Sequence, residues 1–327
     1  MHGPSVNPWV ILVGAIAAGG IIVGAVQWQR WQRRQRGVRP PNTRNLLRPP
    51  GHHLSLRLED YEQKLLSFMT IAVGSGAALA ALGTLLVSPL LNSDVRTWIA
   101  ANGWQHSLFS RPLLPAVLSS TLMLLGCLSG LIFGVERSLD CIKEMRKLYL
   151  GLRGEQAVAE ALLEAAEYAY RAFHDFPGEK SPNGKPWNID HVVVGPGGVF
   201  AIETKTRSKQ KAPAGKQDHK VQYDGIALQF PWEDKPSTEY VEQAKRNAKS
   251  LEGYLGKATG MKVPVKPVLA LPGWYVDTTT KPTTHVVRAM PETALATHLR
   301  EQPRELSAEK IQQIAFQLDQ KCRDVEF

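Results

Sequence analysis

Long apolar tracts interrupt the first part of the chain, and a mixture of short apolar and polar runs follows them. Three tracts contain no Asp, Glu, Lys or Arg: 9–26, 65–93 and 112–135. A helix rises about 1.5 Å per residue, so each tract can reach about 27 Å or more across the core of a bilayer. We therefore expect an α-helical membrane region with three spans, at about 9–28, 65–91 and 112–135. This expectation argues against a purely soluble protein.

Composition agrees with the apolar pattern, because 43% of the residues are hydrophobic and only 21% are charged. The formal net charge of +9 invites a nucleic-acid partner, but residues 1–135 carry 11 basic and 4 acidic residues, against 28 and 26 in 136–327. Most of the excess therefore follows the first apolar tract, as is typical of a cytoplasmic flank. The arginines there are Arg30, Arg33, Arg34, Arg36, Arg39, Arg44 and Arg48.

The order of charge and apolar tract also predicts the topology. The bases follow the first tract, whereas a secretory signal peptide has them in front, so we interpret this tract as a retained anchor. We expect a multi-pass protein of a bacterial inner membrane, with the N-terminus and the 93–111 loop outside and residues 136–327 in the cytoplasm. Gly20 and Gly24 have the spacing of a helix-pairing motif, which leaves a homo-oligomer or a larger membrane complex open.

The cysteines and the paired histidines near the second tract give no metal or redox motif. Cys127, Cys141 and Cys322 form no CxxC pair, which suits a reducing compartment. His52 and His53 have no acidic or cysteine partner at ligand spacing. A metal role for these two histidines is not expected.

Residues 136–327 have the size and pattern of one α/β domain. We expect a helix at 157–169, a strand at 170–176, a hairpin at 221–230, a helix at 238–255 and a final helix capped by Ser307. Further strands are expected at 265–271 and 285–289. Pro264 and Pro267 should prevent the first of these two strands from being central throughout its length.

The most informative stretch is a hairpin around a glycine-rich turn at 195–198. Apolar β-type runs at 188–194 and 199–206 flank this turn. A two-residue or a four-residue connection gives the same register, which places Asp190 directly opposite Glu203 with Cβ atoms about 4.5–5.5 Å apart. The opposite face of the hairpin should carry Ile189, Val193, Phe200 and Ile202.

Lys205 lies two residues beyond Glu203 and so projects from the same face as the two carboxylates. Like charges opposite one another destabilise a sheet unless something compensates them. Mg²⁺, with Mn²⁺ as a second possibility, suits such a pair because it binds one or two carboxylates and keeps several waters. The alternative is that Asp190 and Glu203 lie at a frayed sheet end and pair with Lys205 and Arg207.

The runs 189–194 and 198–205, preceded by 151–155, resemble the nuclease-related domain (NERD) family of the PD-(D/E)xK nuclease superfamily. The resemblance covers about 151–255. It implies a restriction-endonuclease-like α/β fold, with a mixed central sheet flanked by helices, after the membrane region. It also implies metal-dependent hydrolysis of phosphodiester bonds.

The resemblance implies a role for five residues. Asp190 and Glu203 match the metal-binding carboxylates, and Lys205 matches the group that orients or polarises the attacking water. Glu155 matches an acidic residue of the first helix that holds a metal-bound water or a second cation. Gln243 matches a glutamine of a later helix that lies near the site.

A basic loop follows the active strand and is the candidate phosphate-binding segment. Residues 205–220 contain six bases and one acid, Asp218. Such a loop can bind nucleic-acid phosphates with an affinity that falls as salt rises, although a merely solvated loop would have the same composition. Beyond Lys205, its bases are Arg207, Lys209, Lys211, Lys216 and Lys220.

These observations favour a membrane-anchored, divalent-metal-dependent nuclease acting on DNA, or RNA, at the cytoplasmic face of the lipid bilayer. The alternative is a non-catalytic module that binds nucleic acid or protein while tethered to the membrane as part of a larger complex. Retention of Asp190, Glu203 and Lys205 together favours the enzyme.

Overall fold

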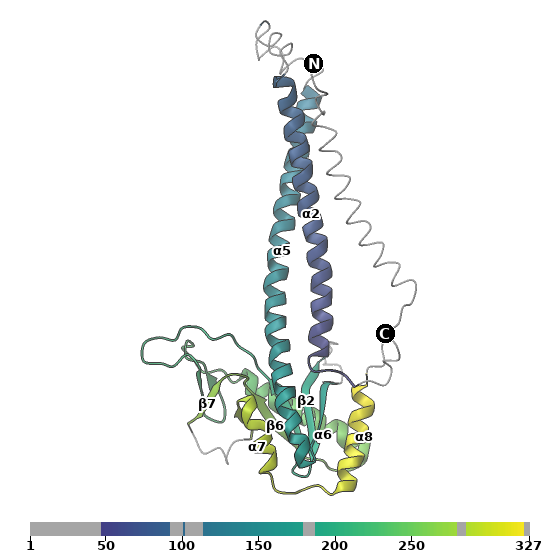
Figure 1. Cartoon of the computed structure of the whole chain (residues 1–327), viewed down its shortest axis with the longest axis vertical. Coiled ribbons are helices and arrows are strands. Elements are labelled where there is room, and N and C mark those ends of the chain that lie inside the picture. Colours follow the sequence, from purple (N-terminus) through teal and green to yellow (C-terminus); the bar gives the residue numbers. More distant parts are fainter. Residues whose placement is uncertain (1–46, 92–100, 102–113, 179–186, 280–285, 324–327) are drawn as a thin grey trace, which may run out of the picture. The chain divides into compact units, whose positions relative to one another are not determined.

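The computed structural model describes residues 47–91, 101, 114–178, 187–279 and 286–323 (Figure 1). The first apolar tract, its arginine-rich flank up to Arg44 and the loop between the other two tracts lie outside the described residues, apart from Ala101. Contacts divide the chain into two units. One unit comprises Met1–Arg39 and Glu59–Met145, and the other comprises Pro40–Leu58 and Arg146–Phe327.

The first unit is built on two helices, α2 (His52–Leu91) and α5 (Leu114–Leu163). Both are long and apolar enough to cross a membrane. They pack closely where residues are small, because a Cβ atom added to Gly134 would lie 2.7 Å from the backbone nitrogen of Ala72. Close approach at small residues is typical of helix pairs in membranes. The structure thus contains two of the three expected candidate spans.

Helix α5 is longer than the sequence pattern predicted. The third apolar tract and the helix expected at 157–169 are one continuous helix, which ends at Leu163 and continues as a 3₁₀ turn, η1 (Glu164–Tyr168). Ala169 then ends the turn with a left-handed φ of 64°.

The second unit contains a five-stranded mixed sheet in the order β1-β2-β3-β6-β8. The first three strands are antiparallel, and β3, β6 and β8 are parallel. Only Val268–Ala270 of β6 pair on both sides, so Pro267 lies where β6 pairs with β3 alone. The prediction that the prolines keep this strand from being central throughout is confirmed. The strand bounds are β1 Arg171–Pro177, β2 Asn188–Gly195, β3 Gly198–Thr204, β6 Val265–Ala270 and β8 Arg288–Met290.

A smaller sheet has the order β5-β4-β7. The expected second hairpin is present, with β4 (Lys220–Tyr223) antiparallel to β5 (Leu228–Gln229). Asp224 stabilises its turn by accepting hydrogen bonds from the backbone nitrogens of Ile226 and Ala227. Strand β7 (Tyr275–Thr278), which the sequence did not predict, pairs in parallel with β4.

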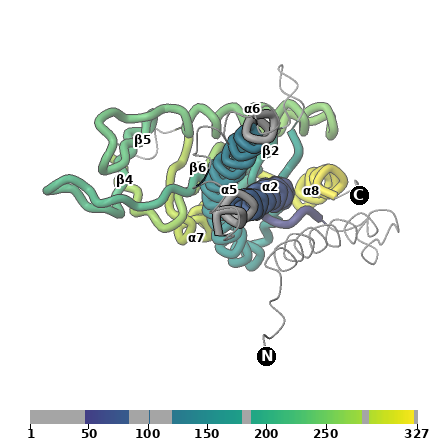
Figure 2. The backbone as a smooth tube through the Cα atoms, turned by 90° about the horizontal axis from the view of Figure 1, so that it is seen from above, coloured from purple at the N-terminus to yellow at the C-terminus, as the bar shows by residue number. Residues whose placement is uncertain are grey.

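Helices cover both faces of the larger sheet, as Figure 2 shows for α6 and α7 on opposite sides of β6. Helices α6 (Glu239–Thr259) and α8 (Ala308–Cys322) enclose one apolar core, and the end of α5 with α7 (Leu295–Arg300) encloses the other. Ser307 caps α8 by accepting a hydrogen bond from the backbone nitrogen of Lys310, as predicted. The unit is therefore the expected α/β fold, a mixed sheet flanked by helices.

The register of the central hairpin is the predicted one, with Val194 opposite Val199. One side chain is on the other face from that expected: Ile189 packs in the core under α6 and α8 together with Val192. The regular alternation of faces is broken at this end of the sheet, where Asp175 of β1 has a left-handed φ of 50°.

Candidate active site

The site lies where strands β2 and β3 separate. Their ladder ends at the pair His191 and Ile202, immediately before Asp190 and Glu203. Beyond this point the backbone nitrogen of Thr204 donates to Oδ2 of Asp190 at 2.7 Å, in place of a strand-to-strand bond. Asp190 and Glu203 are 7% and 2% exposed. The hairpin therefore brings two buried carboxylates together, as its register predicted.

Three donors hold the carboxylate of Glu203. Oε1 accepts from Nζ of Lys205 and from Nε2 of Gln243, each at 2.7 Å, and Oε2 accepts from Nδ2 of Asn247 at 2.6 Å. Gln243 and Asn247 are four residues apart on α6 and so share one face of that helix. Asn247 had no predicted role at the site, although its i+4 spacing from Gln243 could have indicated one.

Glu155 joins these residues from helix α5. It is 5% exposed, and its Oε2 atom has no hydrogen-bond partner within the described part of the chain. Burial is the main cause that raises the pKa of Glu155 to about 7; the charge of His53 opposes the rise, and Asp175 and Glu203 add to it. The structure therefore places Glu155 within electrostatic reach of the hairpin carboxylates.

The surroundings of the site disfavour the ionised forms of its buried carboxyl groups. Burial, followed by the charges of Glu203 and Glu155, raises the pKa of Asp190 well above its ordinary value. Burial also raises the pKa of Glu203, although Lys205 opposes this shift. For Lys205, burial lowers the pKa but Glu203 outweighs it, so the ammonium is stabilised in its charged form. Lys205 interacts with Glu203 and Asp190, so one lysine faces two buried carboxyl groups, and a divalent cation would favour their ionised forms.

The carboxylate oxygens leave room for a divalent ion. Each oxygen can accept two hydrogen bonds or ligand bonds. Oε1 of Glu203 already has two donors, whereas Oε2 has one, and one donor bonds Oδ2 of Asp190. Among the described residues, no group of three His, Cys, Asp or Glu side chains is arranged to hold a metal. Two carboxylates with free lone pairs fit Mg²⁺, which takes few protein ligands and keeps several waters.

Comparison with known proteins identifies the segment that contains the site residues. Residues 150–272 match the family model described as NERD, Nuclease-related domain. This segment is similar to nuclease-related domains. The match covers the site residues Glu155, Asp190, Glu203, Lys205 and Gln243, and it extends the resemblance noted in the sequence. No curated protein and no solved structure matches the chain.

A second group of polar residues beside the nuclease-related site was missed in the sequence. Oδ1 of Asp175 lies 2.6 Å from Nδ1 of His53, and it accepts from Nδ2 of Asn188 at 2.6 Å. The backbone nitrogen of His53 also donates to Oδ2 of Asp175 at 3.2 Å. His53 therefore has an acidic partner, but one 122 residues away in the chain.

The contacts of His53 anchor a short segment, residues 47–58, on the rest of the second unit, which contains the nuclease-related segment. The backbone nitrogen of Arg48 donates to the carbonyl of Cys322 at 2.9 Å. Gly51 approaches α5 so closely that an added Cβ would lie 2.3 Å from Cδ1 of Leu152. The charge of His53 also lowers the pKa values of Glu155 and Glu203. The segment that precedes the second apolar tract is thus part of the surroundings of the site.

The structure gives the predicted basic loop a mixed role. Arg207 forms an ion pair with Glu233 and lies 4.5 Å from the ring centroid of Phe230. Lys220 is paired with Asp277 at 2.9 Å. Those two bases thus stabilise the loop and the small sheet. The remaining predicted bases, Lys209, Lys211 and Lys216, are exposed.

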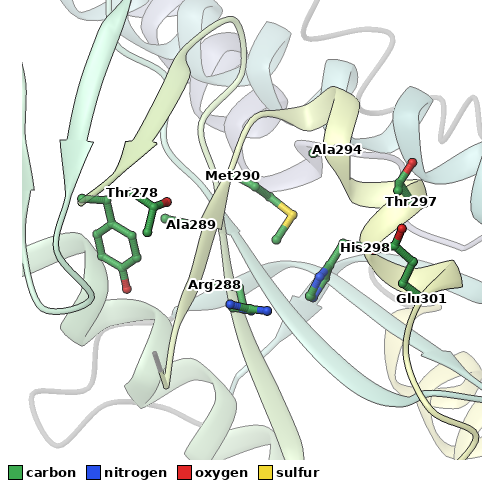
Figure 3. Close-up of a pocket in the computed structure, with 9 residues that line it drawn as sticks. Thr278, Arg288, Ala289, Met290, Ala294, Thr297, His298 and Glu301 are labelled. Carbon is green, nitrogen blue, oxygen red and sulfur yellow. The ribbon is translucent and has the colours of Figure 1, made fainter. Parts of the chain in front are cut away.

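A separate cavity of about 390 Å³ lies between β7, β8 and α7. Figure 3 shows Arg288 and His298 below Met290 in this cavity. Burial, with the charges of Arg288 and Lys266, lowers the pKa of His298. None of the nuclease-related site residues lines this cavity, so it is not part of the candidate active site.

Proposed function

We propose that this chain is a membrane-anchored, divalent-metal-dependent nuclease that hydrolyses phosphodiester bonds of DNA, or of RNA, at the cytoplasmic face. One observation carries the proposal. Glu203 is fixed by three donors beside the buried Asp190, within a segment similar to nuclease-related domains. A carboxylate pair that is both buried and rigidly oriented suits the binding of a cation more than it suits packing.

Asp190 and Glu203 would hold Mg²⁺ or Mn²⁺ through their free lone pairs. When bound, such an ion supplies a nucleophilic water near neutral pH and a positive centre for the charge that develops on the phosphate. Gln243 and Asn247 fix the carboxylate plane of Glu203 and leave it little freedom to rotate. The cation would therefore be held in one geometry.

Lys205 and Glu155 would act on water and phosphate. The ammonium of Lys205 has three donors, of which one bonds Glu203, so it can orient a water or donate to a phosphate oxygen. Oε2 of Glu155 is a buried acceptor without a donor in the described structure. Such an atom normally bonds a water, and we assign Glu155 to hold a water beside the carboxylate pair.

The membrane part of the proposal rests on the two long helices. Their outward side chains are largely apolar, with Val73 of α2 and Leu122 of α5 exposed by 66% and 70%. Exposed apolar surface on this scale is expected of a helix in lipid. With the expected first span, the chain would have its N-terminus outside and its nuclease-related unit in the cytoplasm.

The full-length chain, purified in detergent, tests the proposal directly. Plasmid DNA, single-stranded DNA and RNA should be cleaved with Mg²⁺ or Mn²⁺ and remain intact with EDTA. Asp190→Asn and Glu203→Gln should each lower the rate by at least about a hundredfold, whereas the exposed Asp234→Asn should not. Equal cleavage by folded wild type and the double variant Asp190→Asn/Glu203→Gln would sink the assignment. Binding without cleavage by any substrate would favour the non-catalytic module.

A further inference from the structure

A basic groove runs along one face of α5, outside the carboxylate site. Its volume is about 570 Å³. Five of its lining residues come from two turns of α5, and the sixth comes from the loop after β3. They are Arg146, Lys147, Tyr149, Leu150, Arg153 and Ser208.

The lining has the chemistry of a site for a nucleic-acid strand. Arg146, Lys147 and Arg153 are exposed bases, and none of the six lining residues is acidic. Tyr149 is 44% exposed, which is enough to offer its ring to a base. Bases along a groove together with an exposed aromatic ring are the usual means of holding a single strand.

One wall of the groove, the loop after β3, leads to the candidate active site. On the α5 wall, Glu155 follows Arg153 by two residues but lies on the opposite side of the helix, because residues i and i+2 do not face each other. On the other wall, Ser208 follows Lys205 by three residues. The walls are in contact, because a Cβ added to Gly154 would lie 1.8 Å from Oγ1 of Thr206. A strand lying along the Ser208 wall would therefore be directed toward Lys205.

The length of the groove sets how much of a strand it can hold. The lining residues 146 to 153 of α5 span about 10.5 Å at the helical rise. One strand of B-form DNA advances about 3.4 Å per nucleotide. The α5 wall thus corresponds to about three nucleotides.

We infer that this groove binds the sugar-phosphate backbone of the substrate strand, with Arg146, Lys147 and Arg153 on phosphates and Tyr149 against a base. The inference rests on the proposed nuclease function and assigns its substrate path. Phosphates of lipid headgroups would suit the same three bases. The continuity of the Ser208 wall with Lys205 and the exposed tyrosine ring favour nucleic acid.

Binding of fluorescein-labelled oligonucleotides to the full-length chain in detergent with EDTA tests the inference without cleavage. The triple variant Arg146→Gln/Lys147→Gln/Arg153→Gln should bind at least about tenfold more weakly, and its salt slope should fall by about 0.7 per lost contact on single strands. Lys249→Gln/Lys310→Gln, exposed bases on α6 and α8, is the charge control and should bind as wild type. Tyr149→Ala should weaken binding about fivefold or more, and Tyr149→Phe should restore it.

The outcomes separate this inference from the proposed function. A wild-type chain that cleaves DNA while the triple variant binds it with unchanged affinity and salt slope would overturn the groove and leave the nuclease. A wild-type chain without affinity for DNA or RNA would overturn both. Flotation with vesicles of phosphatidylcholine and phosphatidylglycerol tests whether the groove binds lipid headgroups instead. Loss of vesicle binding in the triple variant, with DNA binding intact, would make the groove a lipid site and overturn the inference.

Discussion

The two units of this protein expose and bury opposite kinds of side chain, and helix α5 belongs to both. In the first unit, Leu122 of α5 is 70% exposed, whereas Val158 in the second unit is fully buried. The second unit instead buries carboxyl groups, at Glu155, Asp175, Asp190 and Glu203. Apolar side chains face outward where lipid is the expected solvent, and inward where water is. The burial of four carboxyl groups in the second unit then requires an explanation, which for Asp175 is its contact with His53.

Arginine at two exposed leucines of α5 should distinguish the two environments most strongly. Leu122→Arg places a charge near the middle of the 112–135 tract and should cost about 3 kcal/mol of membrane insertion. Leu163, 72% exposed at the end of α5 in the other unit, is the matched control. Leu163→Arg should change stability by less than about 0.5 kcal/mol. The fraction of each variant that stays in the membrane after carbonate extraction checks this prediction. Equal fractions for Leu122→Arg and Leu163→Arg would remove the reason to place α5 in lipid.

Gly154→Ala should destabilise the second unit by about 1–3 kcal/mol, because its methyl group would overlap Oγ1 of Thr206. The stability of the first unit should not change. Thr206→Ala removes the overlapping atom, so the double variant should recover most of the loss in thermal denaturation of the full chain. Failure of Thr206→Ala to rescue Gly154→Ala would show that another contact requires the glycine.

His53→Ala should cost the second unit about 1–3 kcal/mol, because it leaves the buried Asp175 without one of its partners. His52→Ala, one residue earlier on the same helix, is the comparison variant. For the same reason a fragment starting at residue 136 should be less stable than the full chain. Thermal denaturation of His53→Ala and His52→Ala measures the loss of stability. An equally small loss in the two variants would argue against an anchoring role for residues 47–58.

Asp190→Asn should have the smallest effect on stability, and in EDTA it should raise the free energy of unfolding. Its neutral amide removes a buried charge that Glu203 and Glu155 disfavour, while its oxygen can still accept from the backbone nitrogen of Thr204. A gain of about 1 kcal/mol corresponds to a rise of roughly 2–4 °C in Tm.

Glu203→Gln serves as the contrast to Asp190→Asn. It should bring no such gain, because its amide would face the donors of Gln243, Lys205 or Asn247. Added Mg²⁺ should raise the Tm of wild type and not that of Asp190→Asn. A stabilising effect of Mg²⁺ on both would place the ion elsewhere.

Local rules made much of the candidate site predictable. A glycine-rich turn fixes the register of a hairpin, and side chains alternate along a strand, so Asp190 and Glu203 could be placed together from the sequence. The i+4 spacing placed Gln243 and Asn247 on one helical face. Ile189 was assigned to the wrong face because a left-handed residue on the neighbouring strand, Asp175, leaves no signal in the β2 sequence.

The sequence by itself determined the apolar tracts, the α/β class and the identity of the carboxylate site, because each depends on residues close together in the chain or on a short turn. Only the tertiary structure decided that His53 pairs with Asp175, that Arg207 is occupied by Glu233, and that residues 146–153 form a groove with Ser208. These contacts join segments that are far apart in sequence or set their relative orientation. Periodicity and spacing do not encode which distant segments meet, since that choice depends on how the whole unit packs.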